Sequence, residues 1–218
     1  MAKKIYLSPS SQPANTYAVG KTNEQVQCRK IAKKAAEALK RCGFEVRDGT
    51  SGTMYTRVAE SNKWGADAHI PIHTNAHNGK TAGFRAFYYE KNGEGHKLCK
   101  AIMDAVAPLT PGTSDGLSKQ DLYELNNSYA PCAYLELGFH DNKEEAQYII
   151  DHIEDLAEAI CKGICKYYGV AYKPPVVNTT GVKLYRVQVG AFSQYANAEN
   201  MLKKIKAAGF SDAFIKEG

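Results

Sequence analysis

Three polar side chains, Glu24, His73 and Glu136, lie at positions where they could bind a metal or transfer protons. His73 closes an apolar strand and enters a loop, and Glu24 opens a helix that follows the first strand. Because sites in parallel sheets lie at the carboxyl ends of the strands, His73 is well placed for a metal or a substrate. Both residues also have plainer explanations: a histidine bonded to a backbone carbonyl, and a glutamate that complements the helix dipole.

Glu136 is the strongest single signal, because it lies inside the apolar strand CAYLELGF (132–139). An ionised carboxylate in a buried strand costs several kcal/mol unless a metal or a cation compensates it. A purely structural role would require an ion pair, with Arg57 or Lys143 as the candidate cations. A functional role would use the carboxylate near the carboxyl end of the strand.

The elements that must position these side chains alternate between strand and helix over residues 1–169. Apolar runs bounded by turn residues predict strands, and helical spacing after Asn23 predicts a helix that ends at Gly43. This alternation predicts an α/β fold, with a mostly parallel twisted sheet and helices on both faces. We expect strands at 4–7, 44–47, 66–76, 84–90 and 132–139, and further helices at 54–64, 94–107 and 143–167.

The composition changes after residue 169. Residues 170–182 (VAYKPPVVNTTGV) contain paired prolines and no helical period, which predicts an extended linker. Residues 183–218 predict a small βαβ unit, with a strand at 184–192, an amphipathic helix at 195–208 and a second strand from 213. So short a unit buries too little apolar surface to be stable alone, so it must dock on the large domain or pair with a second copy.

Charge and hydropathy exclude two classes of partner. The 218-residue chain carries a net charge of +5, and its 28 basic residues are scattered among 23 acidic ones, without the basic stripe that binds nucleic acid. No stretch reaches the roughly 18 apolar residues of a membrane span. The N-terminal MAKKIYLSPSSQ lacks the apolar core of a secretory signal, so we expect synthesis in the cytoplasm.

Six cysteines are present and none of them forms a CxxC pair. Cys161 and Cys165 lie one helical turn apart, a spacing more typical of two core-facing small residues than of a metal pair. We therefore expect all six cysteines to be structural.

Three segments taken together point to one family. NEQVQCRKIAKKAAEALKRCGFEV, ADAHIPIHTNAHNG and PCAYLELGFHDNKEE resemble the three central motifs of the zinc-dependent N-acetylmuramoyl-L-alanine amidases, and the resemblance covers about residues 4–169. It implies a Zn²⁺ cofactor and bacterial peptidoglycan as substrate. It also implies that Glu24 is the carboxylate zinc ligand, His73 an imidazole ligand and Glu136 the catalytic glutamate.

The implied chemistry is hydrolysis of the amide between the lactyl group of N-acetylmuramic acid and L-alanine. Zinc with an open position lowers the pKa of bound water to about 7 and polarises the scissile carbonyl. Glu136 would accept the proton of that water and return it to the leaving amine.

The third zinc ligand departs from the family pattern, which places a histidine directly after the first strand. Here Ser11 takes that place by strict alignment, and no histidine precedes position 69. The carbonyl oxygen of Gln12 is a feasible ligand, and we favour it; Asn15 could contribute similarly. The alternatives are that His69 or His140 is the third ligand, or that the site binds zinc poorly. Further along, we expect Asn75 and His77 to lie at the substrate groove.

The tail LYRVQVGAFSQYANAENMLKKIKAAGF resembles the first βαβ half of a sporulation-related (SPOR) repeat domain, which binds glycan strands of the wall. The resemblance implies wall binding, and the short length predicts that two chains could complete one sheet as a homodimer.

These expectations combine into one functional prediction: a peptidoglycan amidase, of phage or prophage endolysin type, that acts on the wall after release from the cytoplasm. The rivals are a non-catalytic wall-binding module that has lost its metal, and a zinc peptidase that cleaves a different amide.

Overall fold

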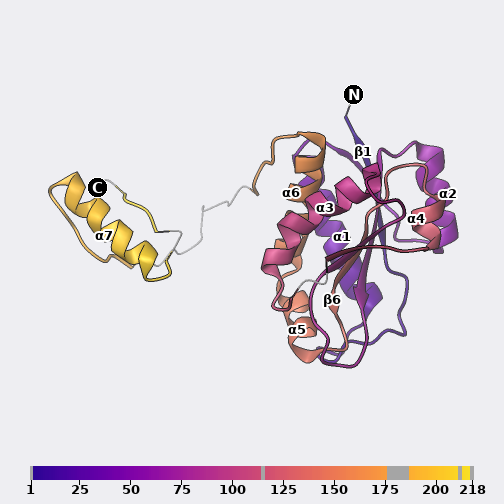
Figure 1. Ribbon diagram of the computed structural model, residues 1–218, viewed down its shortest axis with the longest axis horizontal. Helices are drawn as coiled ribbons and strands as arrows, with labels where there is room; N and C mark the ends of the chain where they lie inside the picture. The colour runs from indigo at the N-terminus through magenta and orange to yellow at the C-terminus, as the bar shows by residue number, and fades with distance from the viewer. Residues whose placement is uncertain (1, 114–115, 176–186, 211–212, 217–218) are drawn as a thin grey trace. The chain divides into compact units, whose positions relative to one another are not determined.

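The computed structural model describes residues 2–113, 116–175, 187–210 and 213–216 (Figure 1). The chain forms two compact units, an N-terminal unit, Met1–Pro175, and a C-terminal unit, Val176–Gly218. Among the described residues, no helix has both the length and the apolar character that crossing a membrane demands.

A six-stranded sheet in the order β2-β1-β3-β6-β4-β5 forms the centre of the N-terminal unit. All neighbouring strands are parallel except β4 and β6, which are antiparallel. The sheet is therefore mostly parallel, as the sequence predicts. The strands are β1 (Lys4–Pro9), β2 (Glu45–Asp48), β3 (Ala68–Asn75), β4 (Arg85–Tyr88), β5 (Gly116–Lys119) and β6 (Tyr134–Phe139).

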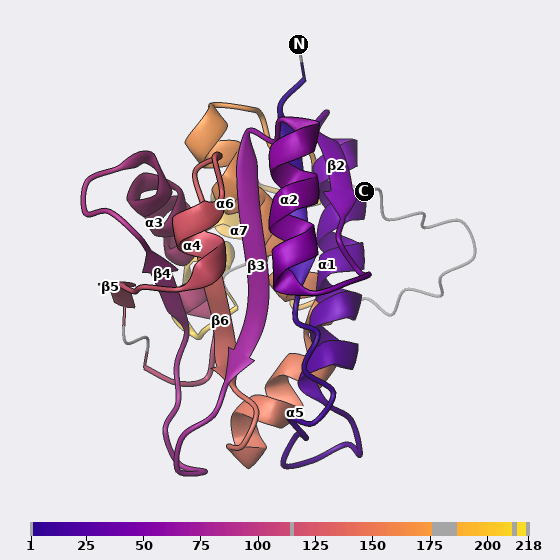
Figure 2. The ribbon, with the colours of Figure 1, turned by 90° about the vertical axis from the view of Figure 1, so that its right-hand side faces the viewer.

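Helices cover both faces of this sheet (Figure 2). They are α1 (Glu24–Arg41), α2 (Met54–Trp64), α3 (Glu94–Val106), α4 (Tyr123–Asn127), α5 (Lys143–Asp151) and α6 (Ile153–Tyr168), with a 3-10 turn at Ala107–Leu109. Ile5, Leu7 and Ile72 belong to the core that includes buried residues of α1, α3 and α6. On the other face, Tyr6 donates to Glu60 of α2 and Ser8 donates to Glu124 of α4. The alternation of side chains along β1 separates the two faces and confirms the predicted fold class.

The helix that carries Glu24 begins and ends where the sequence predicts. The side chain of Asn23 accepts a hydrogen bond from the amide of Val26, which satisfies one of the free N–H groups at the start of α1. Gly43 follows the last turn with φ of +95°, a conformation that glycine adopts without strain. The cap therefore fixes the position of Glu24 as the first helical residue.

Three elements differ from the expectation. The strand β5 and the five-residue helix α4 occupy a segment for which the sequence predicts neither. The single helix expected over 143–167 is two helices, because the backbone of His152 leaves the helical conformation at φ −118°, ψ 31°.

Residues that follow α6 pack back on the N-terminal unit. Val170 and Tyr172 pack against its core, and the hydroxyl of Tyr172 donates to Glu158 of α6 at 2.6 Å. The guanidinium of Arg41 donates to the carbonyl of Lys173 at 2.8 Å. The first residues of the linker expected over 170–182 therefore belong to the N-terminal unit, and residues 176–182 lie outside the described residues.

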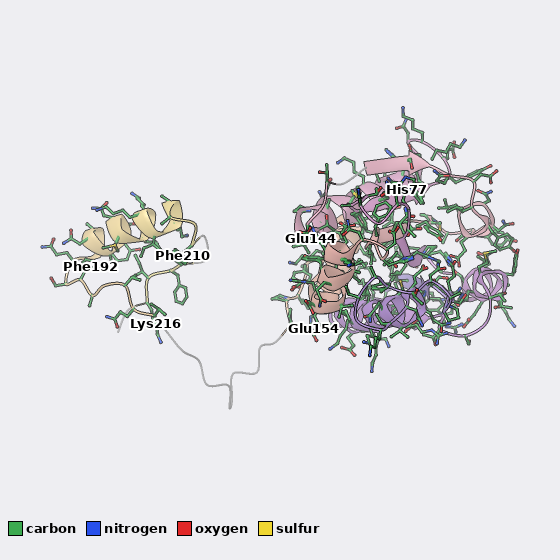
Figure 3. The ribbon with its side chains drawn as sticks, turned by 90° about the horizontal axis from the view of Figure 1, so that it is seen from below. His77, Glu144, Glu154, Phe192, Phe210 and Lys216 are labelled. Carbon is green, nitrogen blue, oxygen red and sulfur yellow. The ribbon has the colours of Figure 1, made fainter. Side chains whose placement is uncertain are left out.

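In the C-terminal unit, the described residues contain one helix, α7 (Tyr195–Ala207), close to the predicted 195–208. Residues 187–192 and 213–215 are not in strands, whereas the sequence predicts strands there; residues 184–186 lie outside the described residues. A strand requires a hydrogen-bonded neighbour, and the described part of this unit offers none. Phe192 and Phe210, labelled in Figure 3, are 43% and 63% exposed.

Candidate active site

The predicted metal-ligand residues gather where β1 and β3 end and α1 begins. His73 is the third residue from the end of β3, and the loop between β1 and α1 carries Gln12 and Asn15. Glu24 and His73 are only 1% and 8% exposed. These two side chains, from segments far apart in the sequence, therefore meet in a nearly dry environment, whereas Gln12 is exposed.

Glu24 and His73 are in direct contact. The Nδ1 atom of His73 lies 2.9 Å from Oε1 of Glu24, and the amide of Asn15 donates to Oε2 at 2.6 Å. Burial raises the pKa of the Glu24 carboxyl, but the hydrogen bonds from His73 and Asn15 outweigh burial and hold this pKa below its ordinary value. The His73 ring stacks on Tyr134, with ring centroids 4.6 Å apart, which fixes the orientation of the imidazole.

Gln12 joins this pair. Its Nε2 lies 3.4 Å from Nδ1 of His73, and its Oε1 accepts a hydrogen bond from Asn15 at 3.1 Å. Ser11 takes no part, because its hydroxyl accepts a hydrogen bond from the Arg57 guanidinium at 3.2 Å. The residue that replaces the expected histidine is therefore bonded elsewhere, and its neighbour Gln12 faces the imidazole.

Glu136 lies directly beside His73 in the sheet. The two residues are register partners on the adjacent strands β3 and β6. One carboxylate oxygen of Glu136, Oε2, is buried and has no hydrogen-bond partner among the residues that the structure describes. Burial, together with the negative charge of Glu24, raises the pKa of Glu136 well above its ordinary value, and the charge of Arg85 opposes this rise.

The cation beside Glu136 is Arg85, its register partner on β4, and not Arg57 or Lys143. Arg57 donates instead to the carbonyl of Pro9, and Lys143 opens α5 as an exposed residue. Sequence reasoning missed Arg85 and Tyr134. Arg85 could have been noticed as a lone charge within the apolar run FRAFYY, but the antiparallel pairing of β4 with β6 has no local signal.

The two alternative histidines have other partners. His69 is fully buried, stacks on Tyr6 and places Nε2 at 3.8 Å from Oε1 of Glu124. His140 places Nδ1 at 3.0 Å from the carbonyl of Thr74 and stacks on Tyr17. Among the described residues, neither histidine forms a hydrogen bond or ring contact with Glu24 or His73, so Gln12 and Asn15 are the candidates beside the pair.

Asn75 and His77 lie further along the chain. The side chain of Asn75 accepts a hydrogen bond from the amide of Ala76, and its carbonyl accepts one from the amide of His140. His77 is exposed at the surface (Figure 3), and its backbone amide donates to Asp141. The structure does not bring either side chain into the cluster around His73.

Comparison with known proteins matches two domain families to the chain. The family model described as N-acetylmuramoyl-L-alanine amidase (Amidase_3) matches residues 8–166, and the SPOR domain model matches residues 166–217. The chain is 26% identical to N-acetylmuramoyl-L-alanine amidase CwlM of Bacillus licheniformis over 166 residues, covering 75% of this chain and 62% of CwlM. It is 29% identical to the germination-specific N-acetylmuramoyl-L-alanine amidase of Bacillus subtilis (strain 168) over 196 residues, covering 79% and 83% of the two chains.

Among solved structures, the fold matches the catalytic domain of CwlV, an N-acetylmuramoyl-L-alanine amidase from Bacillus (Paenibacillus) polymyxa var. colistinus. The TM-score is 0.70 at 22% identity, over 78% of this chain and all of that domain. The motif positions, the fold and the family match point in one direction: the chain belongs to the N-acetylmuramoyl-L-alanine amidase family.

Proposed function

We propose that this protein is a zinc-dependent amidase that cleaves peptidoglycan between the lactyl group of N-acetylmuramic acid and L-alanine. The contact of 2.9 Å between His73 and Glu24, with Glu136 as the register neighbour of His73, carries the proposal. This arrangement brings together two proposed ligand atoms, from Glu24 and His73, and one proposed proton acceptor, Glu136, from three separate segments. The family match supports the same reaction.

The donor set fits zinc. Zinc binds imidazole nitrogen and carboxylate oxygen at about 2.0–2.2 Å, so two ligands of a tetrahedral site lie about 3.3 Å apart. The Nδ1–Oε1 distance of 2.9 Å is close to that separation. The orphaned oxygen Oε2 of Glu136 also fits, because a buried carboxylate oxygen without a partner is expected where a water or a substrate binds.

Gln12 is the third ligand in this proposal, through its carbonyl oxygen. Its Nε2 lies 3.4 Å from Nδ1 of His73 and its Oε1 accepts from Asn15, so the amide would have to turn over to present Oε1 to the metal, whereas Ser11 is bonded to Arg57. An amide oxygen is a weaker zinc ligand than imidazole, so we expect a lower zinc affinity than a site with two histidines would give.

Zinc, when bound, would act as a Lewis acid and lower the pKa of a coordinated water to about 7. Glu136 accepts the proton of the attacking water and returns it to the amine of L-alanine as the amide bond breaks. Tyr134 holds the plane of the His73 ring, and Arg85 keeps a positive charge beside Glu136. Asn75 and His77 are proposed to contact the substrate near the exposed end of β3.

Residues 166–217 are proposed to hold the enzyme on the cell wall, because the SPOR domain model matches them. Pairing of two chains through this unit stays a prediction. A phage origin also stays a prediction. One of the similar proteins is a germination-specific amidase of a bacterium.

Product analysis tests the reaction. Purified peptidoglycan digested with the full chain should release stem peptides that begin with a free L-alanine amine, and the glycan strands should gain no new reducing ends. New amines on residues other than L-alanine would indicate a zinc peptidase. Binding of peptidoglycan without any product, in protein that holds no zinc, would establish the non-catalytic module that the replaced histidine suggests.

A further inference from the structure

Three cysteines, one directly after α1 and two on α6, lie close together near the end of α1. Cys42 follows the last residue of α1, and Cys161 and Cys165 lie one turn apart on α6. The Sγ atom of Cys161 is 3.7 Å from that of Cys42 and 3.9 Å from that of Cys165. Within the part of the chain that the structure describes, this is the one group of three or more cysteine, histidine or acidic side chains whose ligand atoms come so close together.

The spacing of the sulfur atoms matches a metal site. Zinc–sulfur bonds are about 2.3 Å long, so two thiolates of a tetrahedral site lie about 3.8 Å apart. We propose that Cys42, Cys161 and Cys165 bind a divalent thiophilic cation, Zn²⁺ in the first instance, at a site separate from the one formed by Glu24 and His73.

The surroundings of the sulfur atoms suit bound thiolates. The amide of Lys173 donates to Sγ of Cys42 at 3.3 Å, and hydrogen bonds of this kind stabilise the negative charge of a ligating sulfur. The guanidinium of Arg41 lies beside the cluster, where it donates to the carbonyl of Lys173 and to Glu158. Three thiolates and one divalent cation carry a net charge of −1, and Arg41, although paired with Glu158 at 2.6 Å, also favours the charged form of Cys165.

Binding would exchange protons for the metal. The three side chains are at most 5% exposed, and burial raises the pKa of Cys161 and Cys165, so these two thiols are protonated when no metal is bound. One Zn²⁺ would then displace the thiol protons and form three Zn–S bonds, with no change in oxidation state. The bound ion would join α1, α6 and the segment that contains Lys173.

This site is distant from the proposed catalytic zinc. Glu24 is the first residue of α1 and Cys42 follows its last, and a helix of 18 residues is about 27 Å long. The two sites also differ in chemistry, since one offers thiolates and the other a carboxylate, an imidazole and an amide. The inference is therefore independent of the amidase activity.

Cobalt titration tests the site, because thiolate-to-cobalt charge transfer gives a near-ultraviolet band that oxygen and nitrogen ligands do not. The reduced full chain, stripped of metal with a chelator, is titrated with Co²⁺. We expect the band to saturate at one thiolate-bound cobalt per chain, to disappear in Cys161→Ala and to remain in Glu24→Ala. Cys99→Ala is the matched control, because Cys99 is a fully buried cysteine outside the cluster. A wild-type protein without the band, or a band that survives in Cys161→Ala, would overturn the proposal.

A second measurement needs no cysteine substitution, in case Cys161→Ala does not fold. X-ray absorption at the zinc edge of the zinc-loaded wild-type chain should show sulfur neighbours at about 2.3 Å. Only oxygen and nitrogen neighbours, at about 2.0–2.2 Å, would contradict the thiolate site and leave the proposed amidase zinc untouched.

Discussion

The Nδ1 atom of His73 lies 2.9 Å from Oε1 of Glu24, although the two residues are 49 positions apart in the chain. The contact joins the start of α1 to the end of β3, and both side chains are almost fully buried. In the proposed zinc site, two ligand atoms that are already in contact need little rearrangement to hold an ion. The affinity of the site for metal should therefore depend strongly on each of them.

Glu24→Ala and His73→Ala should each lose the zinc of this site, because either change leaves one strong protein ligand beside Gln12. Metal analysis of dialysed protein should show one zinc per chain fewer than in the wild type. Glu37→Ala is the matched control, since Glu37 is an exposed glutamate on the same helix. An undiminished zinc content in both site variants would exclude this pair as the metal site.

Gln12→Ala should weaken zinc binding by at least the roughly 10–100-fold that follows loss of a hydrogen-bond partner of a ligand. Ser11→Ala should have little effect, because Ser11 is bonded to Arg57. Gln12→His should tighten binding, since imidazole is the stronger ligand. Competition with a chromogenic chelator measures all three. A larger loss in Asn15→Ala than in Gln12→Ala would make Asn15 the third ligand.

Glu136→Gln should keep its zinc and its fold but lose about 10²–10⁴-fold in kcat, the usual contribution of a general acid–base group. Glutamine fills the same volume and cannot accept the proton. Turnover of purified peptidoglycan, measured together with zinc content, separates this effect from loss of metal. Glu144→Gln, at an exposed position of α5, serves as the control. Full activity in Glu136→Gln would refute the assigned role.

The buried carboxyl of Glu124 is expected to make the stability of the fold depend on pH. Burial raises its pKa, but His69, together with the Ser8 hydroxyl that donates at 2.6 Å, holds this pKa below the ordinary value of 4.5. A depressed carboxyl pKa stabilises the fold above the unfolded-state value, and the contribution is lost as the pH falls through the folded-state value. Glu124→Gln should therefore lower the free energy of unfolding by about 1.5–3 kcal/mol at pH 7.

The difference in the free energy of unfolding between the wild type and Glu124→Gln should shrink as the pH falls below 4.5, the ordinary pKa of a glutamate carboxyl. Urea unfolding followed by the fluorescence of Trp64, the one tryptophan of the chain, reports on the N-terminal unit alone. A destabilisation that does not vary with pH would show that the charge of Glu124 is not what stabilises the fold.

Most of the fold could be predicted because its signals are local. The strand KIYL, the Asn23 cap and the glycine after α1 lie where the sequence predicts them. The strand β5 was missed because GLSK has no alternating apolar pattern, and α4 because five residues are too few to show a helical period. The strand expected at 184–192 is absent from residues 187–192, because strand formation depends on a partner that no local pattern reveals.

The site was predictable in part for the same reason. Glu24, His73 and Glu136 carry their signals in their own segments, and the structure places Glu24 against His73 and Glu136 beside it. The orientation of Gln12, the contact of Ser11 with Arg57 and the pairing of Arg85 with Glu136 arise from segments far apart in the chain. The meeting of Cys42 with Cys161 and Cys165 is likewise a property of helix packing and not of spacing.

With Glu136 as the proposed proton acceptor, its pairing with His73 makes hydrolysis sensitive to strand alignment. A slip of β6 by one residue against β3 would turn the Glu136 carboxylate toward the apolar interior and put a leucine in its place. Glu24 and His73 would still meet, since neither belongs to β6. Inactive preparations that retain a full complement of zinc would then indicate a misaligned sheet rather than a damaged metal centre.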